Sequence, residues 1–238
     1  SGNYMKIFFN GCSWTDGQEL GEKPDMEKNR FSTVLGKTFD AEIVNIAKSG
    51  TSLHRLLRST YEYCNPSLYD LAVLQFTFPA RTEYYSDDSP AGSREGKFMR
   101  MGPNTVFNVK TKNRAAHGQY RDFFYGNVYS DEMGHTTEYI VFQALQDYFF
   151  RHNVPVITLT LNANTVLPFD LYLDTADVPR AEKGHPNKQG HEVIAGKIES
   201  IIRSGNQVVD AKEAHLNRIR STYARPINPT NPTDYPLV

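Results

Sequence analysis

Four short apolar runs punctuate the chain, and each is nearly continuous instead of alternating with polar residues. They cover residues 6–10, 42–47, 71–76 and 154–161. Strands that are buried on both faces of a parallel sheet have this pattern, because neither face meets water. Between the runs, apolar residues at helical spacing predict helices over residues 52–64, 131–152 and 188–203. Alternating strands and helices predict a three-layer α/β/α fold around a doubly wound, mostly parallel sheet.

Two segments depart from this alternation and set the expected domain plan. The α/β domain is predicted over residues 5–205, with an insertion at residues 83–130 that is rich in Gly, Arg and Tyr and has no clear period. So long an irregular stretch is usually functional, and we expect a loop or lid that shapes a substrate pocket. Residues 206–238 are predicted to form a C-terminal helix and an extended Pro-rich arm, because prolines break helices.

Composition narrows the class of protein. The chain has 238 residues, 39% of them hydrophobic, and a net charge of −1. That balance argues against a nucleic-acid-binding surface, and no apolar run approaches the ~20 residues that span a bilayer. No signal peptide is visible in the sequence, so the expected location is cytoplasmic or phage-associated, with no membrane partner. The Pro-rich arm leaves a homo-oligomer open, since such an arm can wrap around a neighbouring copy.

No cofactor or metal is expected. Cys12 and Cys64 lack metal-ligand spacing. His185 and His191 are not separated by the four residues that place two ligands on one helical face, and no third ligand is evident. We expect His191 on the surface or behind the site, and Arg55 and Arg58 on a solvated helix face.

Polar residues gather where the predicted strands end, which is the edge where open α/β sheets bind ligands. The first strand is followed by Gly11-Cys12-Ser13, the second by Asn45 and Gly50-Thr51, and the third by Thr77 and Arg81 after Gln75. Farther along, Glu182 precedes His185 by three residues, just ahead of the last predicted helix.

These blocks resemble those of the SGNH/GDSL hydrolase family. Gly11-Cys12-Ser13 stands where that family has Gly-Asp-Ser, and residues 45–52 resemble its second block. Residues 182–187 resemble its last block, Asp-x-x-His-Pro. The variant sequence "GCSWT", with "RF" at 30–31 and "GTSLHRLLR" downstream, is most similar to members from phage and environmental bacterial genomes. The resemblance implies the flavodoxin-like SGNH hydrolase fold.

The resemblance also implies roles. Ser13 would be the nucleophile, His185 the base that takes its proton, and Glu182 the acid that orients His185, with Asp177 as the alternative acid. Backbone N–H groups of Ser13 and Gly50 would form part of the oxyanion hole. The implied activity is hydrolysis of carboxylic esters with small acyl groups, on a small molecule or on a carbohydrate that carries O-acetyl groups.

The third block departs from the family. Gln75-Phe76-Thr77-Phe78 replaces Gly-x-Asn-Asp, so the amide that would donate to the oxyanion is missing. Thr77 stands at the asparagine position and is the favoured substitute. Arg81, Asn162 and Asn164 are the alternatives. A glutamate, Glu182, also stands where the family has an aspartate.

Other interpretations stay open at this point. Ser13 could simply cap a helix, because serine is common at that position, and Cys12 could act as a nucleophile with His185. The chain could be a binding or structural module that has lost the chemistry. It could also bind a nucleotide in a flavodoxin-like manner through "GCSWTDG", although it has no GxGxxG motif and no P-loop lysine.

Overall fold

The computed structural model describes residues 4–86, 98–105, 113–163, 165–174 and 176–204. Its main sheet has five strands in the order β2-β1-β3-β6-β7. They are β1 (Lys6–Asn10), β2 (Glu42–Asn45), β3 (Leu71–Phe76), β6 (Val156–Thr160) and β7 (Leu171–Tyr172). Every neighbouring pair in this sheet is parallel, which confirms the predicted α/β class. The short strand β7 was not predicted.

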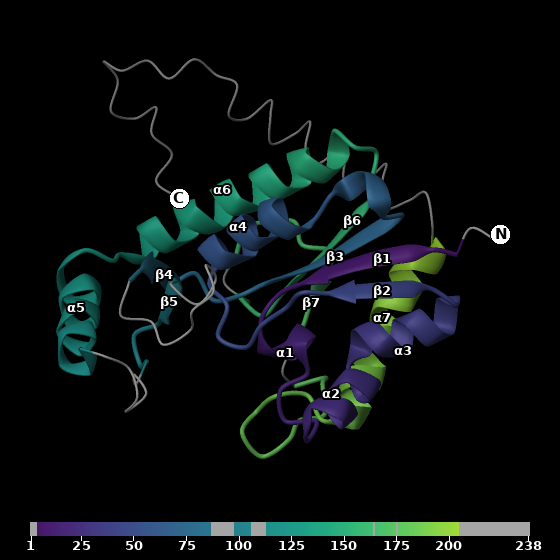
Figure 1. The fold of residues 1–238 in the computed structure, drawn as a ribbon, viewed down its shortest axis with the longest axis horizontal. Helices are drawn as coiled ribbons and strands as arrows, with labels where there is room; N and C mark the ends of the chain where they lie inside the picture. Colours follow the sequence, from purple (N-terminus) through teal and green to yellow (C-terminus); the bar gives the residue numbers. More distant parts are fainter. Residues whose placement is uncertain (1–3, 87–97, 106–112, 164, 175, 205–238) are drawn as a thin grey trace. The chain divides into compact units, whose positions relative to one another are not determined.

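Helices cover both faces of the sheet (Figure 1). Helices α4 (Leu53–Tyr63) and α6 (Asp131–Phe150) lie on one side. Helices α3 (Phe31–Phe39) and α7 (Lys188–Ser204) lie on the other. Shorter elements are α1 (Ser13–Asp16), α2 (Lys23–Asn29) and the 3₁₀ turn η1 (Pro66–Leu68). One compact unit ends at Ile198, within α7.

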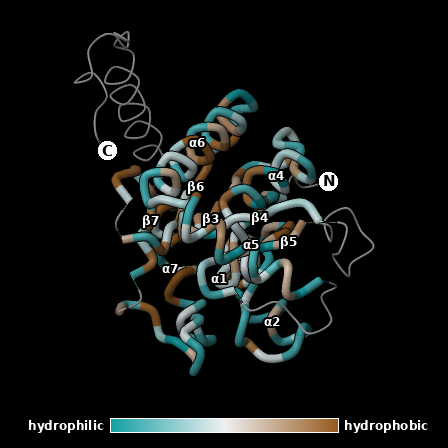
Figure 2. Tube along the Cα trace, turned by 90° about the vertical axis from the view of Figure 1, so that its left-hand side faces the viewer, coloured by the Kyte–Doolittle hydropathy of each residue, from teal (hydrophilic) through white to brown (hydrophobic). Residues whose placement is uncertain are grey.

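The strands read as continuous apolar runs because both of their faces are covered. Phe8, Leu74 and Phe76 pack with residues of α4 and α6 in one core cluster. On the opposite face, Phe9 meets Phe31 of α3 edge to face, with ring centroids 6.0 Å apart. Both hydrophobic and hydrophilic residues occur along α6 (Figure 2), and its buried residues Val141, Phe142, Leu145 and Phe149 belong to that core.

The strand order places a topological switch point between β1 and β3. From β1 the chain first crosses to β2 on one side and later to β3 on the other. Connections therefore diverge at the carboxyl ends of β1 and β3, which is the position where open α/β sheets usually bind ligands. The residues that follow β1 and β3 lie at this position.

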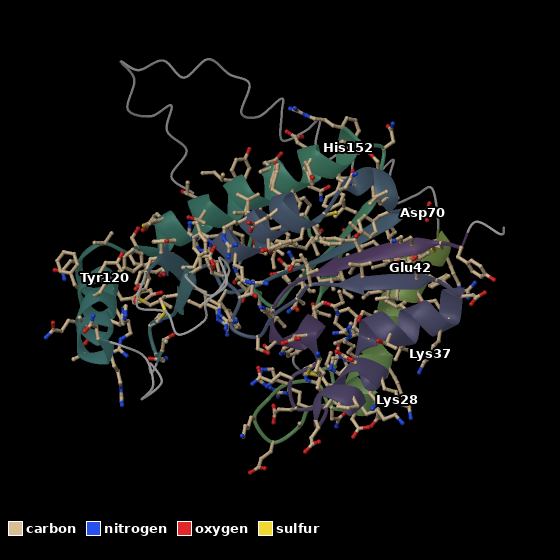
Figure 3. The ribbon with its side chains drawn as sticks, in the orientation of Figure 1. Lys28, Lys37, Glu42, Asp70, Tyr120 and His152 are labelled. Atoms are coloured by element: carbon tan, nitrogen blue, oxygen red, sulfur yellow. The ribbon has the colours of Figure 1, made fainter. Side chains whose placement is uncertain are left out.

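The insertion is more regular than the sequence suggested. Its described parts form an antiparallel hairpin, β4 (Thr82–Tyr85) and β5 (Phe98–Met101), and a helix, α5 (Arg114–Asn127). The prediction of an aperiodic loop is wrong there. The two strands have four residues each, which is too short to show a period, and the 14-residue helix α5 was also missed. Glu42 and Asp70 lie at the opposite end of the molecule from Tyr120 of α5 (Figure 3), so the insertion lies beyond the carboxyl ends of the strands.

Two further observations concern the ends of the chain and membranes. The predicted C-terminal helix and arm at residues 206–238 lie outside the described residues. Among the helices that the structure describes, none is long and apolar enough to cross a membrane.

Candidate active site

The turn after β1 is tight and can be made only by glycine. A Cβ on Gly11 would lie 2.6 Å from Thr15 Oγ1 and 2.7 Å from Gln75 Cβ. The backbone therefore turns directly into α1, whose first residue is Ser13. The Ser13 side chain is 5% exposed, and its hydroxyl points to the Cys12 sulfur at 3.9 Å. The N-cap position of α1 is Cys12, and Ser13 is the first helical residue, so Ser13 is not the capping residue that the simpler interpretation proposed.

Hydrogen bonds connect the second block, residues 45–52, to α1. Asp16 Oδ2 accepts hydrogen bonds from the backbone N–H and the hydroxyl of Ser49, both at 2.9 Å. Asn45 donates its amide to the Thr15 carbonyl at 3.0 Å. Gly50 is exposed and has φ +74°, a left-handed conformation that favours glycine. The Gly50 turn therefore lies beside the helix that begins with Ser13.

The side chain of Gln75 connects the third block, residues 75–78, to the same helix by hydrogen bonds. Its side-chain oxygen accepts hydrogen bonds from the backbone N–H of Thr15 at 3.1 Å and from the Thr15 hydroxyl at 2.6 Å. Its amide nitrogen lies 3.1 Å from the Cys12 sulfur. Gln75 thus caps α1 from a neighbouring strand.

Hydrogen bonds to the carboxylate of Glu19 connect the last block, residues 182–187, to the turn after α1. Glu19 Oε2 lies 2.6 Å from His185 Nδ1 and accepts the His185 backbone N–H at 3.0 Å. Its other oxygen accepts the Lys183 N–H at 2.8 Å. Desolvation raises the pKa of Glu19, but these hydrogen bonds from His185 and Lys183 outweigh it, so the pKa lies below the ordinary value. The carboxylate is therefore ionised at neutral pH.

The structure does not pair His185 with the acid that the sequence suggested. Glu182 is exposed, and within the described residues it makes no hydrogen bond or ion pair with His185. Residues 181–184 form a turn closed by the Gly184 N–H on the Ala181 carbonyl at 3.1 Å, with Glu182 on its exposed side. The alternative acid, Asp177, forms an ion pair with Lys197 at 3.5 Å instead.

The proposed donors to the oxyanion fall into two groups. The backbone N–H groups of Ser13 and Gly50 donate to no acceptor within the described part of the chain. Thr77 is fully buried, and its hydroxyl accepts a hydrogen bond from Arg81 Nη1 at 2.9 Å.

The asparagine alternatives are less suited to this role. The amide nitrogen of Asn162 lies 3.4 and 3.5 Å from the two carboxyl oxygens of Glu138, a residue that is 1% exposed. Desolvation raises the pKa of Glu138, although hydrogen bonds from Thr165 and Asn162 partly offset it. The Asn162 amide is thus directed into the protein, and Asn164 lies outside the described residues.

His191 is not at the surface, as the sequence suggested, but is fully buried. Its Nδ1 accepts the Phe31 N–H at 3.1 Å, and its ring stacks on that of Phe31. Burial, with a smaller contribution from the charge of His185, lowers the pKa of His191 to about 4. Within the described residues no cluster of three His, Cys, Asp or Glu residues is arranged to hold a metal ion.

Three side chains connect the nucleophile segment to the other three blocks. Sequence reasoning missed Glu19 and Asp16, and it named Gln75 only as a polar residue at the end of the third strand, without a partner. Asp16 and Glu19 follow Ser13 so closely that they read as surface residues of a loop. Gln75 reads as a polar interruption of a buried strand, and a buried polar residue at a strand end was the available signal.

Comparison with known proteins gives neighbours at the level of structure. No protein-family model matches the sequence, and no curated protein matches it. The structural neighbours are SGNH/GDSL-type carbohydrate esterases and lipolytic proteins, at low sequence identity. The acetyl xylan esterase AlAXEase is 13% identical with a TM-score of 0.46, over 83% of this chain and 100% of that one.

Two other neighbours are similarly distant. The esterase EstA from Pseudoalteromonas sp. is 12% identical with a TM-score of 0.44, over 84% of this chain and 97% of that one. A protein from Desulfitobacterium hafniense DCB-2, assigned to the lipolytic G-D-S-L family, is 16% identical with a TM-score of 0.36, over 83% of this chain and 99% of that one.

Proposed function

We propose that this protein is a serine hydrolase of carboxylic esters in which Ser13 is the nucleophile, His185 the general base and Glu19 the acid that orients His185. One observation carries the proposal. The segment that begins α1 with Ser13 continues into Glu19, and Glu19 holds His185 Nδ1 at 2.6 Å. An ionised carboxylate can only accept, so Nδ1 carries the proton and Nε2 is left as the proton acceptor.

The reaction then follows from these positions. His185 Nε2 takes the Ser13 proton as Oγ attacks the ester carbonyl carbon, and Glu19 stabilises the imidazolium that forms. The backbone N–H groups of Ser13 and Gly50 are directed at the oxygen on which negative charge develops. The tetrahedral intermediate expels the alcohol, which receives the proton from His185. Water, deprotonated by His185, attacks the carbonyl carbon of the acyl-serine. The second tetrahedral intermediate breaks its bond to Ser13 Oγ, which takes the proton back from His185, and the carboxylic acid is released.

The substrate class is proposed as esters with a small acyl group, including O-acetyl groups on a carbohydrate. Ser13 is 5% exposed, which leaves little room for a bulky acyl chain at the reacting carbon. The aromatic side chains of α5 and the hairpin supply apolar surfaces on which a sugar ring can pack. Tyr84 and Tyr120, for example, have ring centroids 4.8 Å apart.

The test is Ser13-dependent turnover. Wild-type protein should hydrolyse p-nitrophenyl acetate and be labelled by a fluorophosphonate at Ser13, and Ser13→Ala should abolish both. Cys12→Ala is the control for the alternative nucleophile and should retain labelling. Labelling that persists in Ser13→Ala would refute the assignment. A folded wild type that is neither labelled nor active would favour a binding module, which the missing third-block amide also favours.

A further inference from the structure

The third block lacks the asparagine of the family that the sequence resembles, and in the structure the side chain of Arg81 contacts Thr77, the residue assigned to that position. Gln75 of β3 reaches the nucleophile turn, so the side of the chain on which Gln75 lies faces α1. Thr77 follows two residues later, and in an extended chain residues two apart point to the same side. The Thr77 hydroxyl holds the guanidinium of Arg81 at 2.9 Å. A turn closed by the Arg81 N–H on the Phe78 carbonyl at 3.0 Å brings that side chain back over the strand end.

We propose that Arg81 is a catalytic residue that donates to the substrate's carbonyl oxygen as negative charge develops on it, and that Thr77 is the positioning residue that holds Arg81 there. This inference rests on the proposed ester hydrolysis. It assigns to a guanidinium the task that an asparagine amide performs in the family that the sequence resembles.

Solvent exposure favours Arg81 over Thr77 as the side chain that donates to the substrate oxygen. Thr77 is 0% exposed, so its hydroxyl cannot meet a bound substrate without rearrangement. Arg81 is only partly buried, so part of its guanidinium can face a ligand. That guanidinium has five N–H donors, and Thr77 takes one of them.

Charge supports the same assignment. Among the described residues, the side chain of Arg81 contacts the Thr77 hydroxyl and the Phe78 ring, 5.2 Å away, and forms no ion pair with a carboxylate. Arg58 on α4 is different, because it binds both oxygens of Glu83 at 2.9 and 3.2 Å. A partly buried cation that is held by a neutral hydroxyl retains its full charge for a ligand, whereas Arg58 is neutralised.

The competing donor is occupied. The Asn162 amide faces the buried carboxyl of Glu138, so it would have to abandon that partner to reach a substrate. Arg81 needs no such exchange.

The experiment is chemical rescue of a truncated arginine. Arg81→Ala should lower kcat for p-nitrophenyl acetate by about 10²- to 10³-fold, the usual loss of one oxyanion donor, with KM nearly unchanged. Millimolar guanidinium should then restore kcat at least about tenfold, because a free cation can occupy the vacated position. The wild type and Arg151→Ala, which removes an exposed arginine at the end of α6, should show no acceleration.

Thr77 supplies the second arm. Thr77→Val as a single substitution should lower kcat. In combination with Arg81→Ala it should lower kcat little further, and guanidinium should no longer restore activity, because the hydroxyl that holds the guanidinium is gone. Arg81→Met, which keeps side-chain bulk but has no N–H donor, replaces Arg81→Ala if that variant does not fold, with the same expected loss of kcat.

Three results would overturn the inference. They are full activity in Arg81→Ala or Arg81→Met, a folded Arg81→Ala that guanidinium cannot rescue, and rescue that persists when Thr77→Val is combined with Arg81→Ala. Failure of the proposed function looks different, because the wild type itself would then show no Ser13-dependent turnover.

Discussion

Glu19 and His185 lie far apart in the sequence, yet the carboxylate of Glu19 meets His185 Nδ1 at 2.6 Å and also accepts the His185 backbone N–H at 3.0 Å. A single carboxylate therefore fixes both the ring and the backbone of the proposed base. Because Glu19 follows α1, the nucleophile and the orienting acid belong to one short segment. A movement of that segment therefore shifts Ser13 and Glu19 together relative to His185.

Replacing Glu19 by glutamine should be far more damaging than replacing Glu182. An amide can present its NH₂ group to Nδ1, which would place the imidazole proton on Nε2 and remove the base. We expect Glu19→Gln to lower kcat/KM for p-nitrophenyl acetate by about 10³-fold or more. Glu182→Gln is the matched control, since its carboxylate is exposed, and its rate should stay near that of the wild type. The opposite ranking of the two variants would return the role to Glu182.

The sequence was sufficient for the elements that are long or continuously apolar. The strands β1, β3 and β6 and the helices α4, α6 and α7 were located within a few residues. Both faces of such strands are buried, so their pattern depends little on the partner. The short strands β4, β5 and β7 were missed, since two to four residues carry no readable period. The 14-residue helix α5 was missed as well, so length alone did not make an element readable.

Side-chain pairing could not be read in the same way. Glu182 was chosen because it precedes His185 by three residues, but a turn with Gly184 at φ +91° leaves it on the exposed side. Arg55 was expected in solvent and is 3% exposed, with its guanidinium 3.3 Å from the Thr51 hydroxyl. The first error concerns a contact between segments that are distant along the chain, because His185 pairs with Glu19. The second concerns a helical side chain that folds back onto the turn just before its own helix. Sequence spacing alone determines neither contact.

Gln75 should matter for both stability and nucleophile placement. Gln75→Met keeps the volume but leaves the buried N–H and hydroxyl of Thr15 without their acceptor. We expect a loss of about 2 kcal/mol in the free energy of unfolding, measured by urea titration, because each unsatisfied buried group costs about 1–3 kcal/mol. Fluorophosphonate labelling of Ser13 should slow at temperatures where the variant is still folded. Gln189→Met, at an exposed position of α7, is the control and should change neither.

Arg58 should anchor the insertion to the domain. It binds the Glu83 carboxylate with two nitrogens and stacks on Phe98 at 3.9 Å, so it joins α4 to both strands of the hairpin. Arg58→Lys cannot make the bidentate contact, and the Glu83 side chain, 4% exposed, would keep a poorer partner. We expect a loss of about 1–3 kcal/mol in unfolding free energy and a higher KM for esters, with Ser13 labelling retained. An unchanged melting temperature and KM would show that the hairpin is held by other contacts; Arg151→Lys is the matched control.

The last prediction concerns acid stability and rests on His191. Its Nδ1 must accept the Phe31 N–H at the start of α3, which only the neutral ring can do. Burial lowers the pKa of His191 from 6.5 to about 4, so the unfolded chain binds a proton more readily than the folded protein. The stability from the neutral ring is fully present above pH 6.5 and is lost as the pH falls from there through about 4.

Between pH 7.5 and 4.5 this amounts to about 2–3 kcal/mol of unfolding free energy in the wild type. The variant His191→Asn keeps an acceptor for the Phe31 N–H but cannot titrate. It will be less stable at pH 7.5, because a smaller side chain leaves a cavity. Its unfolding free energy, from urea titrations at the two pH values, should fall by about 2–3 kcal/mol less than that of the wild type. Equal falls in the two proteins would mean that His191 takes up its proton without disturbing the contact to α3.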